Sequence, residues 1–219
     1  DPKKAVIISG YPRSGNSWLA RLLADCLDSP VSRFESALPL STECEDRPGD
    51  WFVSQLHIHP VEYPGEKRAL VDASHFNVLA YGGEKIICII RDPRDVAISA
   101  MHYWELPDIT HTLNAMYEGN EPFLGVGPWN EFVNSWAWDN TIPSLLIRYE
   151  QLCAQTEKNL LWMLRYIIRK DIGEKKWTNK IKEVVARQEI NTKRKQIIED
   201  EARGIRRPYG KTIQLKHLR

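Results

Sequence analysis

The sequence predicts an α/β fold, in which a parallel β-sheet is flanked by helices on both faces. Short runs rich in β-branched residues alternate with longer segments whose apolar residues recur every three or four positions. A loop with two glycines follows the first run, and a later run is apolar almost throughout, as is typical of a strand covered on both faces. Strands separated by helices in this way form parallel sheets.

The first strand and helix are predicted near the N-terminus. Residues 5–9 form a short β-branched run that ends at Gly10, which predicts a buried strand. From Ser14 onward the apolar residues have helical spacing, and the sequence Asp28-Ser29-Pro30 predicts the end of that helix. Residues 30–68 are rich in proline, glycine and charge, and we expect loops with little regular structure there.

The later elements continue the alternation. We expect strands at 69–72, 85–90 and 144–148 and helices at 93–103, 128–138, 155–169 and 174–189. Proline and glycine are scattered over residues 105–128, which predicts a loop. The chain has no internal repeat, and its length of 219 residues fits a single domain over residues 1–219.

Composition and charge exclude several classes of protein. The chain is 42% hydrophobic and 27% charged, which indicates a globular protein rather than a disordered one. Its net charge of +1 gives no general reason to bind nucleic acid or membrane, although residues 191–219 hold nine Lys or Arg against three acids. No run approaches the ~20 apolar residues of a membrane span, and no signal peptide is visible. The chain starts at Asp1, which leaves open a removed N-terminal segment.

The four cysteines have neither paired nor metal-ligand spacing, which favours small buried side chains and a reducing compartment. We therefore expect a cytoplasmic protein that has no nucleic-acid or membrane partner and needs no metal.

The strongest functional signal is the loop at residues 10–18, Gly-Tyr-Pro-Arg-Ser-Gly-Asn-Ser-Trp. Its glycines and Ser17 have the spacing of a nucleotide-binding phosphate loop, but Asn16 stands where that loop has the lysine that reaches the β- and γ-phosphates. A strand, a glycine loop and a helix point backbone N–H groups and a helix dipole at an anion. The loop predicts a P-loop-like site for a nucleotide without a γ-phosphate. The alternative is a glycine turn that only reverses the chain.

A second anion site is indicated by Arg91, which directly follows the apolar run at 85–90. Ser99 lies about two helical turns later and could bind the same anion. The alternative is an ion pair of Arg91 with Asp92 or Asp95 that orders the turn.

His75 follows the predicted strand at 69–72 and is a candidate general base, because histidine titrates near neutrality. From the residues alone, other histidines remain alternatives for this role: His57, His59, His102 and His111.

Together these motifs resemble the sulfotransferase family that uses 3′-phosphoadenosine 5′-phosphosulfate (PAPS). Residues 11–18 resemble its 5′-phosphosulfate loop, usually Pro-Lys-Ser-Gly-Thr-Thr-Trp, and residues 91–99 resemble its 3′-phosphate motif. Ser74-His75 resembles the Thr-His that ends the family's central strand and supplies the base. Residues 127–136 and 146–152 resemble the conserved helix and the Tyr-Glu-Asp-Leu segment near the adenine, so that the match covers about residues 5–170.

The resemblance implies transfer of a sulfuryl group from PAPS to a hydroxyl or amine of a small-molecule or glycan acceptor, with PAP (3′-phosphoadenosine 5′-phosphate) as product. His75 would be the base, and Arg13 would stabilise the transferring group in place of the family's lysine. The nucleotide site would comprise Arg13, Ser14, Gly15, Asn16, Ser17, Trp18, Arg91, Ser99 and Tyr149.

The chain departs from the family pattern at three places. Arginine replaces lysine at position 13, and Ala73 stands two residues before His75 where the family has a lysine. The family closes its nucleotide site with an Arg-Lys-Gly segment. Either Arg219 begins that segment and the C-terminal lid is incomplete here, or Arg206-Arg207 with Gly210-Lys211 substitutes for it.

Two other functions stay open at this point. A kinase for a nucleoside or small molecule would need Mg²⁺, and Asn16 disfavours it. A nucleotide- or RNA-binding module would use the basic residues of 191–219, among which Tyr209 is the single aromatic residue and which therefore have little aromatic interleaving. The acceptor and the oligomeric state cannot be read from the sequence.

Overall fold

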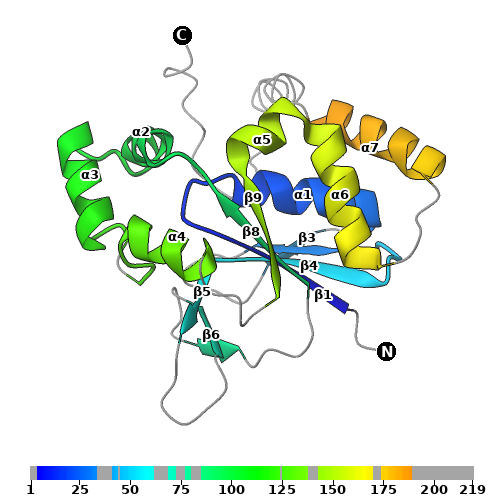
Figure 1. The fold of residues 1–219 in the computed structure, drawn as a ribbon, viewed down its shortest axis with the longest axis horizontal. Coiled ribbons are helices and arrows are strands. Elements are labelled where there is room, and N and C mark those ends of the chain that lie inside the picture. The colour runs from blue at the N-terminus through cyan, green and yellow to red at the C-terminus, as the bar shows by residue number, and fades with distance from the viewer. Residues whose placement is uncertain are drawn as a thin grey trace.

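A computed structural model describes residues 4–33, 41–43, 45–61, 69–72, 77–79, 85–123, 125–137, 143–169 and 174–188 of the chain. Its main sheet has six strands in the order β3-β2-β4-β1-β8-β9 (Figure 1). These strands are β1 (Lys4–Gly10), β2 (Val31–Arg33), β3 (Ser41–Glu43), β4 (Trp51–Leu56), β8 (Lys85–Ile90) and β9 (Ser144–Arg148). Neighbouring strands are parallel except for the pair of β2 and β3. The predicted parallel sheet is confirmed.

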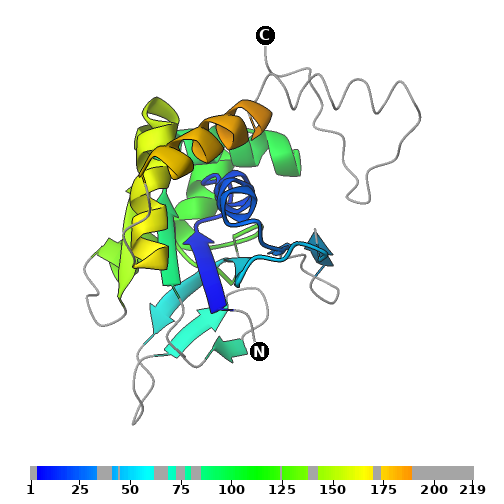
Figure 2. The ribbon, with the colours of Figure 1, turned by 90° about the vertical axis from the view of Figure 1, so that its right-hand side faces the viewer.

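Helices cover both faces of this sheet, as expected (Figure 1). One face carries α1 (Asn16–Leu27), α5 (Tyr149–Ala154), α6 (Thr156–Ile168) and α7 (Glu174–Gln188). The other carries α2 (Pro93–Trp104), α3 (Ile109–Glu118) and α4 (Trp129–Ala137). Figure 2 shows α7 lying across α1 and α6, and α7 packs against both. No helix among the described residues is long and apolar enough to cross a membrane.

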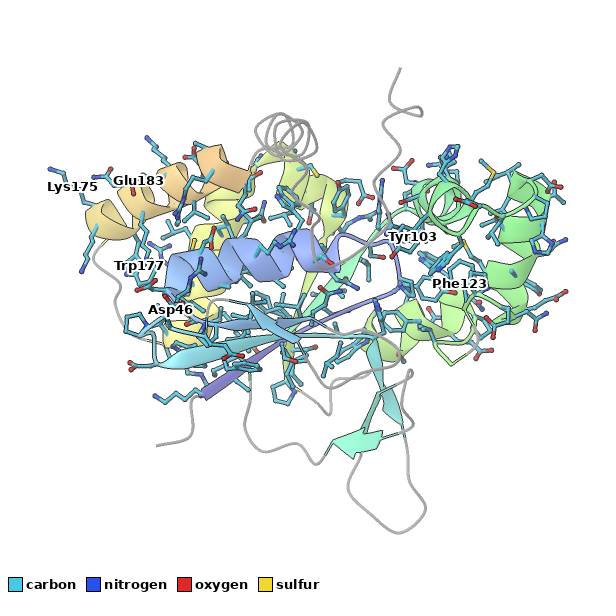
Figure 3. The ribbon with its side chains drawn as sticks, turned by 180° about the vertical axis from the view of Figure 1, so that it is seen from behind. Asp46, Tyr103, Phe123, Lys175, Trp177 and Glu183 are labelled. Carbon is cyan, nitrogen blue, oxygen red and sulfur yellow. The ribbon has the colours of Figure 1, made fainter. Side chains whose placement is uncertain are left out.

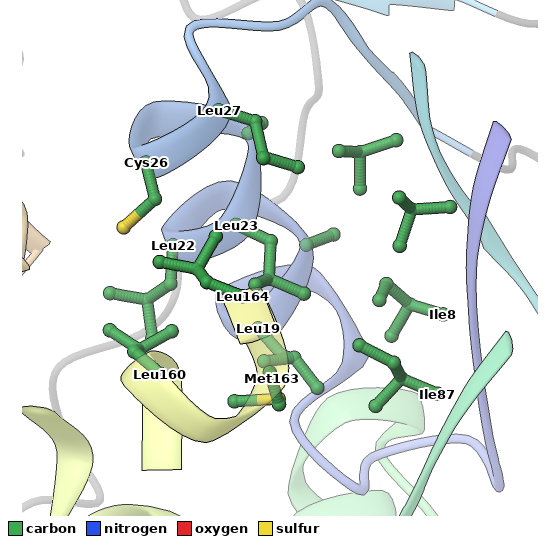
Figure 4. Packing of buried hydrophobic residues seen from close by; sticks show 14 of the residues in the cluster. Ile8, Leu19, Leu22, Leu23, Cys26, Leu27, Ile87, Leu160, Met163 and Leu164 are labelled. Atoms are coloured by element: carbon green, nitrogen blue, oxygen red, sulfur yellow. The ribbon is translucent and has the colours of Figure 1, made fainter. Parts of the chain in front are cut away.

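Alternate side chains of the central strands enter two separate cores, because successive residues of a strand point to opposite faces. Ile8 of β1 and Ile87 of β8 pack against α1 and α6 (Figure 4). Ile7 and Ile86 pack against the helices of the opposite face. Each fully buried side chain of this size contributes roughly 1.5–3 kcal/mol. The strands that carry the loop at residues 10–18 and Arg91 are thereby fixed from both sides.

Two predicted loops contain regular structure, and these expectations were wrong. Residues 30–68 hold β2, β3, β4 and also β5 (Ile58–Val61). The prolines, glycines and charges around these short strands favoured a loop interpretation, although β4 pairs with β1 over most of its length. Residues 105–128 hold α3, whose N-cap Asp108 accepts a hydrogen bond from the His111 backbone N–H and whose C-cap is Gly119. Glycine ends this helix rather than excluding it.

A second, three-stranded antiparallel sheet has the order β5-β6-β7, with β6 (Ala69–Asp72) and β7 (Asn77–Leu79). Figure 1 shows β5 and β6 below the main sheet on the side of α4, which contacts β5. The strand predicted at 69–72 therefore exists, but it belongs to this sheet and not to the parallel one. A four-residue strand has no local feature that decides which sheet it joins.

The carboxylate of Asp92 caps α2, and we expect its effect on stability to depend on pH. It accepts hydrogen bonds from the side chain and the backbone N–H of Arg94, which lower the pKa of Asp92 from 3.8 to about 2. The stabilisation is therefore fully present above about pH 4 and is lost as the pH falls toward 2. Asp92→Ala should lower the midpoint of thermal unfolding at pH 7 but much less near pH 2. At pH 7 the midpoint of Asp92→Asn should lie between those of Asp92→Ala and the wild type. Equal midpoint shifts at both pH values would contradict this role.

Candidate active site

The carboxyl ends of four adjacent strands bring the functional side chains together. The four strands are neighbours in the order β4-β1-β8-β9. His57 directly follows β4, and the loop that begins at Tyr11 follows β1. Arg91 directly follows β8, and Tyr149 follows β9. Ligands of open α/β sheets bind in the crevice beyond the carboxyl ends of the strands. This edge of the sheet is therefore the candidate active site.

The loop after β1 has a backbone shape that only a few residues tolerate. Gly15 has φ +96°, and a Cβ there would lie 2.6 Å from Cδ2 of Tyr149. Arg13 has φ +69°, a left-handed conformation that costs a non-glycine residue roughly 1–2 kcal/mol. Such strain persists where the surroundings over-determine it, which is common at active sites.

The N-terminus of α1 is open to an anion. Its N-cap is Gly15, and within the described residues no side chain caps the helix and no acid lies in its first turn. The Ser14 hydroxyl is buried and lacks a hydrogen-bond partner among the described residues. Ser17 is exposed in the first turn. Unpaired N–H groups, a positive dipole end and an unpaired hydroxyl together fit a phosphate group.

Asn16 stabilises the loop by hydrogen bonds to the loop's own backbone. Its side chain is buried, and its Nδ2 donates to the carbonyl oxygen of Gly10 at 2.9 Å and to that of Tyr11 at 3.4 Å. At the position of a phosphate-loop lysine, this side chain therefore holds the loop's own backbone.

His57 is held in one tautomer by the same loop. Its Nδ1 lies 2.6 Å from the carbonyl oxygen of Gly10. Because a carbonyl oxygen can only accept, Nδ1 carries the hydrogen of the neutral ring and donates it there. The contact of 3.2 Å between Nδ1 and Nδ2 of Asn16 is then not a hydrogen bond. The other ring nitrogen, Nε2, keeps its lone pair and can accept a proton.

Arg13 joins the loop to α2. Its Nε donates to Oγ of Ser99 at 3.1 Å, and its guanidinium lies over the ring of Tyr103, 4.0 Å from the centroid. Burial lowers the pKa of Arg13, while Tyr103 raises it and the nearby Arg91 lowers it further. Ser99 therefore binds Arg13 here, where the sequence predicted an anion shared with Arg91.

Arg91 approaches the loop from β8. Its Nη1 donates to the carbonyl oxygen of Arg13 at 3.0 Å, and its guanidinium lies 4.5 Å from the ring centroid of Tyr149. Its Nε is buried without a partner in the described part of the chain. Among the described residues Arg91 forms no ion pair with Asp92 or Asp95, and the Asp92 carboxylate binds Arg94 instead. An unpaired donor on a charged group is expected where an anion binds.

Tyr149 and Trp18 form an aromatic wall beside Arg91. Their rings meet edge to face with centroids 6.0 Å apart. Burial raises the pKa of Tyr149 to about 12, so its hydroxyl stays neutral. The indole Nε1 of Trp18 is buried and has no partner among the residues that the structure describes.

The structure thus gathers most of the predicted site at one edge of the sheet. These residues are Arg13, Ser14, Gly15, Asn16, Ser17, Trp18, Arg91, Ser99 and Tyr149. His75, Ala73 and residues 189–219 lie outside the described residues. Sequence reasoning missed Tyr103, and it gave His57 only as an alternative. The signal for His57 was its place directly after residues 51–56, which begin with Trp51, Phe52 and Val53.

These features define an α/β protein with a P-loop-like candidate anion site. A model of the sulfotransferase domain matches residues 3–207, and the chain belongs to the sulfotransferase family. The resemblance predicted from the motifs is confirmed.

Two curated relatives carry the family's name. The chain is 24% identical to sulfotransferase 1E1 of Cavia porcellus over 197 residues, which is 77% of this chain and 60% of the relative. It is 24% identical to sulfotransferase 2A1 of Homo sapiens over 166 residues, 71% and 56% of the two chains. The chain therefore spans less than two thirds of the length of these relatives.

Solved structures share the fold. Mouse sulfotransferase SULT7A1 complexed with PAP has a TM-score of 0.57 at 19% identity, over 88% of this chain and 66% of that one. Retinol dehydratase in complex with androsterone and the inactive cofactor PAP has a TM-score of 0.58 at 14% identity, over 93% and 71%.

Proposed function

We propose that this protein transfers a sulfuryl group from PAPS to a hydroxyl or amine of a small acceptor. One observation carries the proposal. Among the described residues, two sets of polar groups without a hydrogen-bond partner, the N-terminus of α1 with the Ser14 hydroxyl and the Nε of Arg91, follow adjacent strands of the sheet. This arrangement suits a nucleotide with phosphate groups at two ends. The PAP in the SULT7A1 and retinol dehydratase structures supports the same nucleotide.

The residues of the site divide into groups by the part of the nucleotide they would hold. The loop amides with Ser14, Gly15, Asn16 and Ser17 would hold the 5′-phosphate, Arg91 and Ser99 the 3′-phosphate, and Trp18 and Tyr149 the adenine. Bound PAPS supplies the activated sulfuryl group. Arg13 neutralises negative charge next to the loop, where a preorganised cation stabilises charge that develops during transfer.

We propose His57 as the general base. It directly follows β4, a central strand of the parallel sheet, and its Nδ1 lies 2.6 Å from the carbonyl oxygen of Gly10. A neutral ring with its hydrogen on Nδ1 would take the acceptor's proton at Nε2. His75 was predicted because Ser74-His75 resembles the Thr-His that ends the family's central strand. The strand before it, β6, lies in the second sheet, which favours His57. With His57 as the base, the buried Gln55 two residues before it, rather than Ala73, would stand where the family has a lysine. His75 stays the alternative that mutagenesis decides.

For the acceptor we propose a small apolar alcohol rather than a glycan, because the solved retinol dehydratase structures hold androsterone or retinol. The free thiols of Cys26, Cys88 and Cys153 fit a reducing compartment, and we propose the cytoplasm.

Thermal unfolding with added nucleotides tests the proposed function. A ligand at one hundred times its Kd stabilises the folded state by about 2.7 kcal/mol, which raises the unfolding midpoint by several degrees. We expect PAP to do so without Mg²⁺, and ADP to do so less because it lacks the 3′-phosphate. Protection by ATP with Mg²⁺ but not by PAP would indicate a kinase and overturn the proposal. Protection by neither nucleotide would also overturn it.

Arg91→Ala should weaken PAP binding by about 10- to 100-fold in isothermal titration calorimetry. Hydrogen bonds to charged groups contribute roughly 1.5–3 kcal/mol, and this change removes the donors on the 3′-phosphate side. Arg94→Ala is the matched control, because Arg94 lies three residues away with a side chain 83% exposed and bound to Asp92. Equal affinities of Arg91→Ala and the wild type would remove Arg91 from the nucleotide site.

A further inference from the structure

We propose that Tyr103 is a positioning residue for Arg13. The Tyr103 ring and the Ser99 hydroxyl hold the Arg13 guanidinium so that its two terminal nitrogens are left to bind the sulfuryl donor. The proposal rests on the role given to Arg13 in the proposed function. It concerns how this chain orients an arginine where its family has a lysine.

Three parts of the Arg13 guanidinium have to be accounted for. Its face is covered by the Tyr103 ring, with the central carbon 4.0 Å from the centroid. Its Nε donates to Ser99 at 3.1 Å, which is the side-chain hydrogen bond of Arg13 within the described residues. The edge formed by Nη1 and Nη2 remains, and two parallel N–H groups on that edge match two oxygens of a sulfate or phosphate group.

Tyr103 is itself fixed by a series of aromatic contacts that returns to the loop. Its ring meets Trp104 edge to face at 5.4 Å, and Trp104 meets Phe123 at 5.3 Å. Phe123 stacks on Tyr11 at 5.3 Å, and Tyr11 lies two residues before Arg13. Figure 3 shows Tyr103 and Phe123 together at the end of the molecule that holds α2. The Tyr103 ring that contacts Arg13 and the loop backbone that carries Arg13 are therefore both held by one aromatic cluster.

The identity of residue 13 explains why such a holder is needed. A lysine ammonium is a compact charge that binds an anion from many directions, whereas a guanidinium binds two oxygens only when its plane is correctly oriented. Tyr103 is 50% exposed, although its ring is large and mostly apolar. Burial in the core therefore does not explain this ring, whereas the cation–π contact with Arg13 gives it a role.

Arginine side-chain NMR of the ligand-free protein tests the contact without turnover. The Nε–Hε resonance of Arg13, assigned by its loss in Arg13→Lys, should be shifted by the ring current of Tyr103. Tyr103→Leu should abolish the shift and Tyr103→Phe should preserve it. Tyr117→Leu, at a tyrosine 76% exposed on α3, is the matched control and should leave it in place. A shift that survives Tyr103→Leu overturns the proposal.

Kinetics then tests the consequence. Tyr103→Leu should lower kcat about fivefold, the equivalent of the roughly 1 kcal/mol of an exposed cation–π contact, with little change in the KM for PAPS. Tyr103→Phe should retain more than half of the rate. In an Arg13→Lys background, Tyr103→Leu should cost less than twofold, because no guanidinium plane is left to orient. A loss of equal size in both backgrounds, or a Phe variant as slow as the Leu variant, overturns the proposal.

The experiments distinguish a failure of the proposed function from a failure of this inference. If the wild type does not transfer sulfuryl groups from PAPS, or if Arg13→Ala is fully active, the proposed function fails. If Arg13→Ala is inactive while Tyr103→Leu has wild-type kcat, only the positioning role fails.

Discussion

His57→Ala should lower kcat by about 10²- to 10⁴-fold while PAP still binds, because removing a positioned general base has an effect of this size. The neutral ring donates from Nδ1 to the Gly10 carbonyl and so keeps Nε2 as the acceptor of a proton. The loop keeps its shape without the ring, since Asn16 also donates to that carbonyl. Turnover of PAPS with a small alcohol and calorimetry with PAP separate the two effects.

The comparison that decides the base is His57→Ala against His75→Ala. His111→Ala, at an exposed histidine on α3, controls for the loss of any imidazole. We expect both of these variants to stay within about threefold of the wild-type rate. A large loss in His75→Ala together with an active His57→Ala would assign the base to His75 instead.

The parts of the site that sequence predicts are those encoded locally. The loop at residues 10–18 contains its strand end, its two glycines and the start of its helix within a few residues, so its shape follows from the pattern alone. Arg91 likewise follows directly from the apolar β8. Local encoding also explains why the helix predicted at 155–169 agrees with α6 (Thr156–Ile168).

The parts that sequence missed depend on contacts between distant residues. His57 is close to Gly10 because β4 pairs with β1 in the register that places Gln55 opposite Ile8. Nothing within residues 51–57 specifies that pairing, and the prolines and glycines nearby favour a loop.

The approach of Arg13 to Ser99 joins residues 86 positions apart, and it depends on how α2 packs beside the loop. Spacing along the chain therefore predicted candidate residues that lie at one edge of the sheet, but not which of them contact one another.

Arg13→Ala should lower kcat by about 10²- to 10³-fold, the loss seen when one preorganised donor to a developing negative charge is removed. Its strained φ of +69°, its half-buried position and its contacts to Ser99 and Tyr103 all fix the cation before the donor binds. Fixed charges stabilise a transition state without the cost of reorganisation, which is why this residue should affect rate more than binding.

The loss in Arg13→Ala should accordingly appear in kcat far more than in the affinity for PAP, a product that has lost the transferring group. Arg13→Lys should recover part of the rate, because lysine restores the charge but not the planar pair of donors. Arg165→Ala, at an exposed arginine on α6, controls for the change in net charge. If Arg13→Ala weakened PAP binding as much as it slowed turnover, Arg13 would act in holding the nucleotide, and the stabilisation of the transferring group would have to come from the loop amides instead.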